Sequence, residues 1–202
     1  QFQISAVVGL RHAVTFRWVG QLFIARIQGI LKGNRIIHHL GINQIKTIAA
    51  GRTKALHWFD LERFYAEARR VLKPTGIVAV WCYGIVELEG DAANQLLQHF
   101  YHQVVGPYWP AEREHVETGY RQLPFPFTPI EAPAFTMQVT WTRAQLMGYL
   151  RSWSATGRYQ AAQGVDPVLA FEQAISSAWG DADRGRLVSW PLSLRVGRAS
   201  GG

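Results

Sequence analysis

Cysteine is nearly absent from this chain of 202 residues, in which Cys82 is the only one. No disulfide can form within the chain, which indicates a reducing, cytoplasmic setting. The sequence also lacks an uncharged apolar run of membrane-spanning length. Its most hydrophobic stretch, residues 13–31, is interrupted by Arg17 and Arg26, so no membrane span is expected.

Acidic residues are missing from the start of the chain. Residues 1–56 contain eight Lys or Arg and no Asp or Glu, whereas residues 57–202 contain thirteen basic and fourteen acidic residues. The first part also holds nine of the thirteen Ile. This joint change predicts a boundary near residue 52, between an atypical basic, Ile-rich segment at 1–52 and a domain at 53–202.

Two classes of site are disfavoured by the pattern of residues. His99 and His102 lie three positions apart, but no Cys or acid is placed to complete four metal ligands, so we expect exposed histidines and no metal site. The basic residues of the first segment are spread among Ile and Leu instead of forming a run. Nucleic-acid binding through that segment is therefore the least favoured alternative.

From residue 60 onward, helical and strand patterns alternate, which is typical of an α/β fold. Helix caps are expected at Asp60, at Asp91, and at Thr142 together with Gln145. The unbroken apolar run 77–83 predicts a strand covered on both faces. The Pro- and aromatic-rich stretch 107–133 predicts a functional loop or lid. The predicted helices are 60–72, 91–105, 143–153 and 167–179, and the predicted strands of one sheet are 77–83, 135–141 and 188–196.

Several short segments carry a family resemblance at the correct spacing. They are residues 54–60 (KALHWFD), 70–76 (RVLKPTG), 149–155 (YLRSWSA) and 190–195 (WPLSLR). Together, residues 53–198 resemble the C-terminal two-thirds of a Rossmann-like class I S-adenosylmethionine-dependent methyltransferase, most closely of the trans-aconitate methyltransferase-like group. The resemblance implies that the fourth strand ends near residue 55, that 77–83 is the fifth, and that 135–141 and 188–198 close the sheet as an antiparallel pair.

The resemblance also implies a site at the carboxyl ends of the central strands. Leu56, His57 and Trp58 would contact S-adenosylmethionine, and His57 would act as a catalytic base or orienting donor. The substrate would be a small molecule, with a carboxylate as the candidate methyl acceptor. Packing without a functional role is the competing interpretation for His57 and for each aromatic residue. The expected substrate-pocket residues are Tyr83, Tyr108, Trp109 and Trp153.

The half of the fold that should hold the cofactor is missing or replaced. The family needs a glycine-rich turn after its first strand and an acid after its second, and Gly9, Gly29 and Gly33 supply neither the spacing nor the acid. A frameshift, truncation or fusion affecting residues 1–52 would explain the change in composition. We therefore expect weakened cofactor binding and a sheet edge prone to association. A non-catalytic remnant or small-molecule-binding protein is the alternative function.

Overall fold

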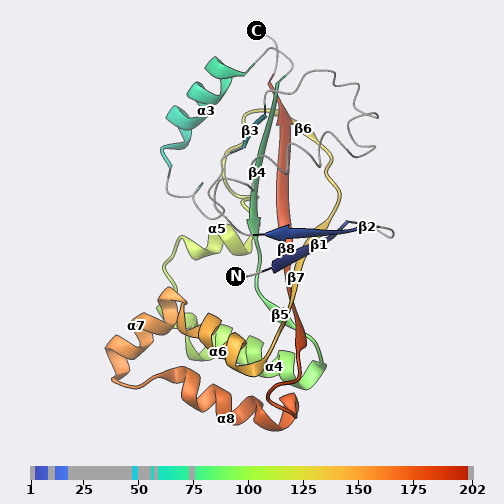
Figure 1. Cartoon of the computed structure of the whole chain (residues 1–202). Coiled ribbons are helices and arrows are strands. Elements are labelled where there is room, and N and C mark those ends of the chain that lie inside the picture. The colour runs from blue at the N-terminus through green and yellow to red at the C-terminus, as the bar shows by residue number, and fades with distance from the viewer. Residues whose placement is uncertain are drawn as a thin grey trace. The chain divides into compact units, whose positions relative to one another are not determined.

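The computed structural model describes residues 3–8, 12–17, 47–49, 56, 59–72 and 76–199 (Figure 1). The chain divides into two compact units. The sheet unit comprises Gln1–Gly84, Glu114–Met137 and Pro191–Gly202, and the helical unit comprises Ile85–Arg113 and Gln138–Trp190. None of the helices in the described ranges combines the length and the apolar character that crossing a membrane requires.

Mixed strand pairing defines the sheet, whose order is β2-β1-β7-β8-β4-β3. β4 runs parallel to β3, with Thr47 opposite Ile77, and antiparallel to β8, with Ile77 opposite Arg198. Figure 1 shows β4 and β8 side by side along their length. The strands are β1 Gln3–Val8, β2 His12–Arg17, β3 Thr47–Ala49, β4 Ile77–Tyr83, β5 Glu87–Leu88, β6 Thr128–Ile130, β7 Phe135–Trp141 and β8 Arg186–Arg198.

The strand predictions are confirmed. β4 and β7 have the predicted bounds, and β8 includes the predicted 188–196. The apolar run of β4 is buried from Ile77 to Cys82, as expected for a covered strand. β8 is antiparallel to β4 and has β7 as its other neighbour in the strand order, so the two last strands lie next to each other as the resemblance implied. The expected strand end near residue 55 lies outside the described residues, whereas β3, parallel to β4, belongs to the basic first segment.

Helix α3, at Leu61–Val71, contributes Tyr65 and Ala68 to the core of the sheet unit. Asp60 caps it as predicted, since its Oδ1 accepts from the backbone N of Arg63 at 3.1 Å. Val71, the last residue of the helix, is 37% exposed. Cys82 is fully buried in the same core, as the sequence predicted.

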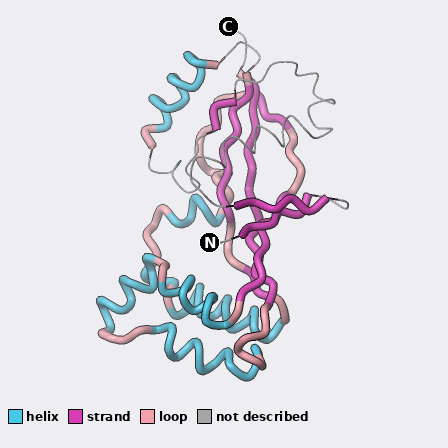
Figure 2. Tube along the Cα trace, viewed as in Figure 1, coloured by secondary structure: helices cyan, strands magenta, loops and turns pink. Residues whose placement is uncertain are grey.

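The helical unit contains four α-helices, which Figure 2 shows in cyan. The predicted helices at 91–105, 143–153 and 167–179 are confirmed, although the first ends in a π-helix. Sequence analysis missed α7, because this helix buries only Ala155 and Thr156 and has no apolar stripe. The elements are α4 Asp91–His99, η2 Phe100–Val104 (π-helix), η3 Gly106–Tyr108 (3-10 helix), α6 Arg143–Arg151, α7 Ser154–Gln163 and α8 Pro167–Trp179.

Two local expectations need correction. Asp91 does not cap α4: the cap is Gly90, at φ 92°, and Asp91 makes no capping hydrogen bond. A positive φ favours glycine, while an acid in the first turn suits the helix dipole. The stretch 107–133 is also not free of regular structure, because it contains α5 (Arg113–Glu117) and β6. The capping box of Thr142 and Gln145 is confirmed.

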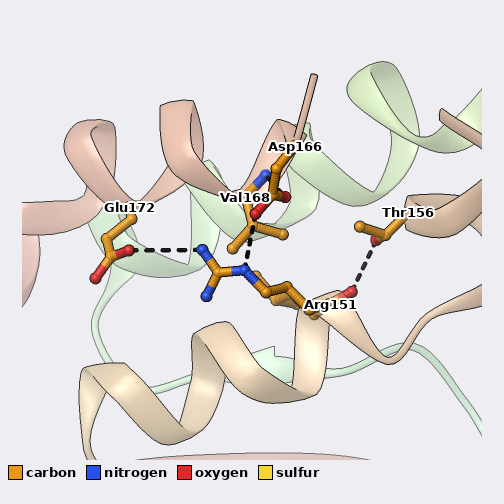
Figure 3. A network of polar contacts seen from close by, with 6 residues as sticks. Arg151, Thr156, Asp166, Val168 and Glu172 are labelled. Carbon is orange, nitrogen blue, oxygen red and sulfur yellow. Dashed lines mark hydrogen bonds and ion pairs between the residues drawn. The ribbon is translucent and has the colours of Figure 1, made fainter. Parts of the chain in front are cut away.

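A polar network joins α6, α7 and α8 (Figure 3). Arg151 Nε donates to Asp166 Oδ2 at 2.8 Å, and Asp166 Oδ1 accepts from Val168 N at 2.9 Å. Partial burial acts to raise the pKa of Asp166, but these two hydrogen bonds and the charge of Arg151 lower it. The helix start predicted at Asp166 is thus held by both a cap and an ion pair.

Candidate functional site

Two of the predicted pocket residues, Trp109 and Trp153, meet in the helical unit. Their ring centroids are 5.5 Å apart, and both pack against Tyr101, at 5.3 Å from Trp109 and 5.5 Å from Trp153. Trp153 is buried, whereas Trp109 is half-buried. Aromatic rings at these separations form stable tilted and edge-on pairs. We call Tyr101, Trp109, Arg113, Tyr149 and Trp153 the ring cluster.

Local backbone features bring these rings together. Trp153 is the residue before α7, and Trp109 follows η3, which contains Pro107. Tyr101 lies in the π-helix, where Val105 N bonds to Phe100 O at 3.0 Å, five residues back. The wider turn shifts the register of the side chains that follow it, and such turns often occur at functional sites.

Arg113 adds a positive charge to the rings. Its guanidinium carbon lies 4.8 Å from the ring centroid of Trp109 and 5.5 Å from that of Tyr101. Arg113 Nε also donates to Tyr101 Oη at 2.7 Å. A half-buried guanidinium over two ring faces is held by cation–π attraction and by this hydrogen bond. The cluster therefore has a fixed cationic side.

Tyr149 supplies a neutral hydroxyl to the same cluster. Its ring centroid lies 5.5 Å from that of Trp153, and its Oη accepts from Trp190 Nε1 at 3.1 Å. Burial raises the pKa of Tyr149. Hydrogen bonds from Trp190 and Trp153 and the charge of Arg113 lower it, but burial has the larger effect. The phenol thus keeps its proton at neutral pH and remains a hydrogen-bond donor.

The other predicted residues occupy different places. Tyr108 is half-buried, packs against Tyr159 at 5.0 Å and accepts from Gln163 Nε2 at 2.8 Å, so it joins η3 to α7. Tyr83 belongs to the sheet unit, where it ends β4 opposite Leu192. Leu56 is buried in the apolar core of the sheet unit.

The predicted catalytic residue His57 and the predicted cofactor contact Trp58 lie outside the described part of the chain. Sequence analysis did not single out Tyr101, Arg113 or Tyr149. Their role depends on the π-helix and on long-range packing, for which no local pattern gives a signal. Within the described ranges, no group of three or more metal-ligating side chains occurs, and His99 and His102 are exposed.

Comparison with known proteins gives related molecules in sequence and in structure. No protein-family model matches this chain. It is 24% identical over 132 residues to a Dictyostelium discoideum protein named "Putative methyltransferase", a match that covers 64% of this chain and 50% of that protein. The solved structure of a "Putative Type II Methyltransferase" from Anaeromyxobacter dehalogenans is 37% identical, with a TM-score of 0.71. That match covers 78% of this chain and 65% of the solved one.

The structural match shows the fold class of the chain. The α/β sheet and its structural neighbour give the chain a Rossmann-like methyltransferase fold. In both sequence and structure the chain is similar to proteins named as methyltransferases. The chain spans half the length of the curated relative and 65% of the solved chain.

Proposed function

We propose that this protein is an S-adenosylmethionine-dependent methyltransferase that acts on a small molecule, with a carboxylate as the candidate methyl acceptor. The observation that carries the proposal is the structural match to a solved methyltransferase at 37% identity and a TM-score of 0.71. The same match supports the methyltransferase resemblance of residues 53–198. The finer assignment to the trans-aconitate methyltransferase-like group rests on the sequence segments alone. The single, buried Cys82 supports a reducing, cytoplasmic setting.

The proposed roles divide between the two units. In the helical unit, Trp109 and Trp153 would form the wall against which the acceptor lies, with Tyr108 beside them. In the sheet unit, Tyr83 at the end of β4 would bind substrate. Leu56, His57 and Trp58 would contact the cofactor, and His57 would orient or deprotonate the acceptor. A largely aromatic lining with a few polar groups is typical of small-molecule sites.

The residues that the structure describes do not fit a complete cofactor site. β1 and β2 form an antiparallel pair, with Gln3 opposite Arg17, in place of a strand followed by a glycine-rich turn and a helix. The first acid of the sequence, Asp60, binds the backbone and side chain of Arg63 at the start of α3. The side chain of Leu56 is buried among apolar residues.

The antiparallel pair β1–β2 favours a second candidate function, a small-molecule-binding protein of the same family without catalytic activity. Such a protein would keep the aromatic wall of the helical unit and lose the cofactor. The two candidates differ in one measurable property, which is the affinity for the cofactor.

Isothermal titration of the full chain with S-adenosylhomocysteine separates them. A methyltransferase should bind it, and the loss of each charged hydrogen-bond partner should weaken binding by about ten- to a hundred-fold relative to an intact family member. His57→Asn should weaken binding further, while the control His99→Asn, at an exposed helical position, should not. Absence of binding to the unaltered chain would reject the enzyme proposal and leave the binding protein.

A further inference from the structure

The exposed side of helix α8 differs from that of an ordinary surface helix. Solvent-facing positions of a helix in a globular protein usually carry charged residues. Helix α3 follows this rule, and its exposed charged residues are Glu62, Arg63, Glu67, Arg69 and Arg70. Within α8, which the structure describes in full, no exposed residue is charged. Its exposed residues, which we call the α8 face, are Leu169, Ala170, Gln173, Ala174 and Ser177.

The α8 face is one continuous side of the helix, because its members follow the helical spacing of three and four residues. The other side of α8 is packed in the helical unit, where Phe171, Ile175 and Trp179 are buried. Glu172 is the charged residue of α8, and it pairs with Arg151 of α6 at 4.0 Å (Figure 3). A helix that is uncharged on its outer side has the composition of a helix covered on both sides.

Large apolar side chains are exposed where α8 begins. Leu169 is 56% exposed, and Val165, which precedes the cap residue Asp166, is 57% exposed. No other large apolar side chain in the described ranges is exposed as much. Apolar surface left in water favours association with another surface. The start of α8 therefore adds an attractive contribution to a face that carries no repulsive charge.

The absence of charge restricts what can cover the α8 face. A lipid surface attracts amphipathic helices that carry Lys or Arg beside their apolar residues, and the α8 face has neither. A partner with a charged surface would bury charges there without counter-charges, which costs free energy. A second copy of this chain meets neither difficulty, because a twofold axis places the same uncharged face on both sides of the contact.

We propose that two copies of this chain associate through their α8 faces, with the two helices antiparallel about a twofold axis near Gln173 and Ala174. This axis places Ala170 of one copy opposite Ser177 of the other, where short side chains let the helices pack closely. A helix of 13 residues is about 20 Å long, which is small for an interface, so we expect a weak dimer. The proposal goes beyond the proposed function and does not depend on it.

Sedimentation equilibrium of the full chain, from low to high micromolar concentrations, measures the association. We expect a reversible equilibrium between monomer and dimer, without any cofactor or substrate. A monomer throughout this range would overturn the proposal. Association through a sheet edge would not respond to changes in α8, so variants of the α8 face separate the two modes of pairing.

Charge variants at Ala174 test the twofold contact. Ala174→Glu puts a carboxylate near the axis in both copies, and repulsion should raise the dissociation constant of the dimer at least about tenfold. Ala174→Arg should weaken the dimer similarly, with positive charges. An equimolar mixture of the two variants should restore the dimer, because opposite charges then face each other. Glu and Arg are strong helix formers, and far-UV circular dichroism shows whether α8 variants are folded.

The matched control is Ala66→Glu, the same substitution at an exposed position of α3, and it should leave the dissociation constant unchanged. If Ala174→Glu associates as the unaltered chain does, the contact lies elsewhere and the proposal is overturned. A mixture that fails to restore the dimer would overturn it as well. If the Ala174 variants unfold, Gln173→Glu decides, because it adds a charge with almost no change of shape, and a dimer that it leaves unweakened would overturn the α8 contact.

Discussion

Each unit holds an arginine against aromatic rings, and the two arginines have different partners. Arg195 of the sheet unit lies 4.7 Å over the ring of Phe125, and Arg113 of the helical unit lies 4.8 Å over that of Trp109. Arg195 donates to the main-chain oxygens of Tyr120 and Leu123. Arg113 donates instead to a side-chain hydroxyl. The first arrangement fixes a segment of backbone, whereas the second joins two side chains.

The rings around the two arginines also differ in their hydrogen-bond partners. In the sheet unit, Tyr65 packs edge-on against Phe125 and Phe127, and its hydroxyl donates to Pro124 O at 2.9 Å. In the helical unit the partners are mixed, because Trp190 Nε1 donates to Tyr149 Oη, whereas Trp179 Nε1 donates to Arg184 O at 3.1 Å. The Tyr65 and Trp179 bonds hold the backbone in place, whereas the Trp190–Tyr149 bond depends on the identity of two side chains.

The comparison predicts its largest effect at Arg195. Arg195→Met should destabilise the protein by about 2–4 kcal/mol, because two main-chain oxygens lose a charged donor. Arg113→Met should cost about 1 kcal/mol, since it removes one bond to a hydroxyl and a cation–π contact at a half-buried position. Urea unfolding curves measure both values. Similar losses for the two variants would break the distinction between the arginines.

A second prediction concerns how tightly each unit is packed. A Cβ on Gly197 of β8 would lie 2.6 Å from Phe127 Cβ and 2.7 Å from Phe125 Cε1, so Gly197→Ala should cost about 1–3 kcal/mol. Gly157 of α7 has nothing within 4 Å of such an atom, and Gly157→Ala should stabilise its helix by about 0.5–1 kcal/mol. Thermal melting shows the two shifts. A melting temperature that Gly197→Ala leaves unchanged would contradict the packing of β8.

A third prediction compares the two buried phenols. Tyr149→Phe should cost about 1–2 kcal/mol, because Trp190 is buried and its indole loses an acceptor. Tyr65→Phe should cost about 0.5–1 kcal/mol, because the Pro124 oxygen lies in an exposed residue and can bind water instead. Urea midpoints at neutral pH measure these costs. A larger loss for Tyr65→Phe would reverse the expected ranking.

The raised pKa of Tyr149 adds a pH dependence to that comparison. The neutral phenol contributes its full stability below the pKa of the unfolded chain, roughly 10, and the contribution is lost as the pH rises toward the higher folded value. The unaltered chain should therefore lose stability at alkaline pH, and Tyr149→Phe should lose less over the same range.

The smallest expected effects are at the helix caps. Asp166→Ala should cost about 1 kcal/mol through loss of the cap and of a partly exposed ion pair with Arg151. Because the pKa of Asp166 is lowered, its contribution is present above the unfolded value, roughly 3.9, and is lost as the pH falls through the folded one. The difference between wild type and Asp166→Ala should thus vanish in acid.

The cap of the sheet unit is the control for this effect. Asp60→Ala should cost about 0.5 kcal/mol, because the Asp60 side chain is 57% exposed and its ion pair with Arg63 is screened by solvent. Guanidinium titrations at several pH values compare the two variants. If Asp166→Ala is still less stable than the unaltered chain below the folded pKa of Asp166, this would contradict the role assigned to the Asp166 carboxylate.

The sequence predicted elements better than it predicted sites. Trp109 and Trp153 were expected at a substrate pocket and lie together in the helical unit, although their binding role is still a prediction. Tyr101, Arg113 and Tyr149 were not found, because a π-helix turn and a long-range ring contact leave no periodic pattern. Helix α7 was missed for a related reason, since it lacks the apolar stripe by which a helix is recognised.

The sequence by itself determined features whose physical cause lies within a few residues. Asp60, Asp166 and the pair Thr142–Gln145 begin helices because their side chains bind the nearby backbone. The run 77–83 forms a buried strand because each of its side chains is apolar. Only the tertiary structure decided which distant groups meet: Tyr149 and Trp190 are 41 residues apart in the chain. Such contacts depend on chain closure and on side-chain packing, which no local pattern encodes.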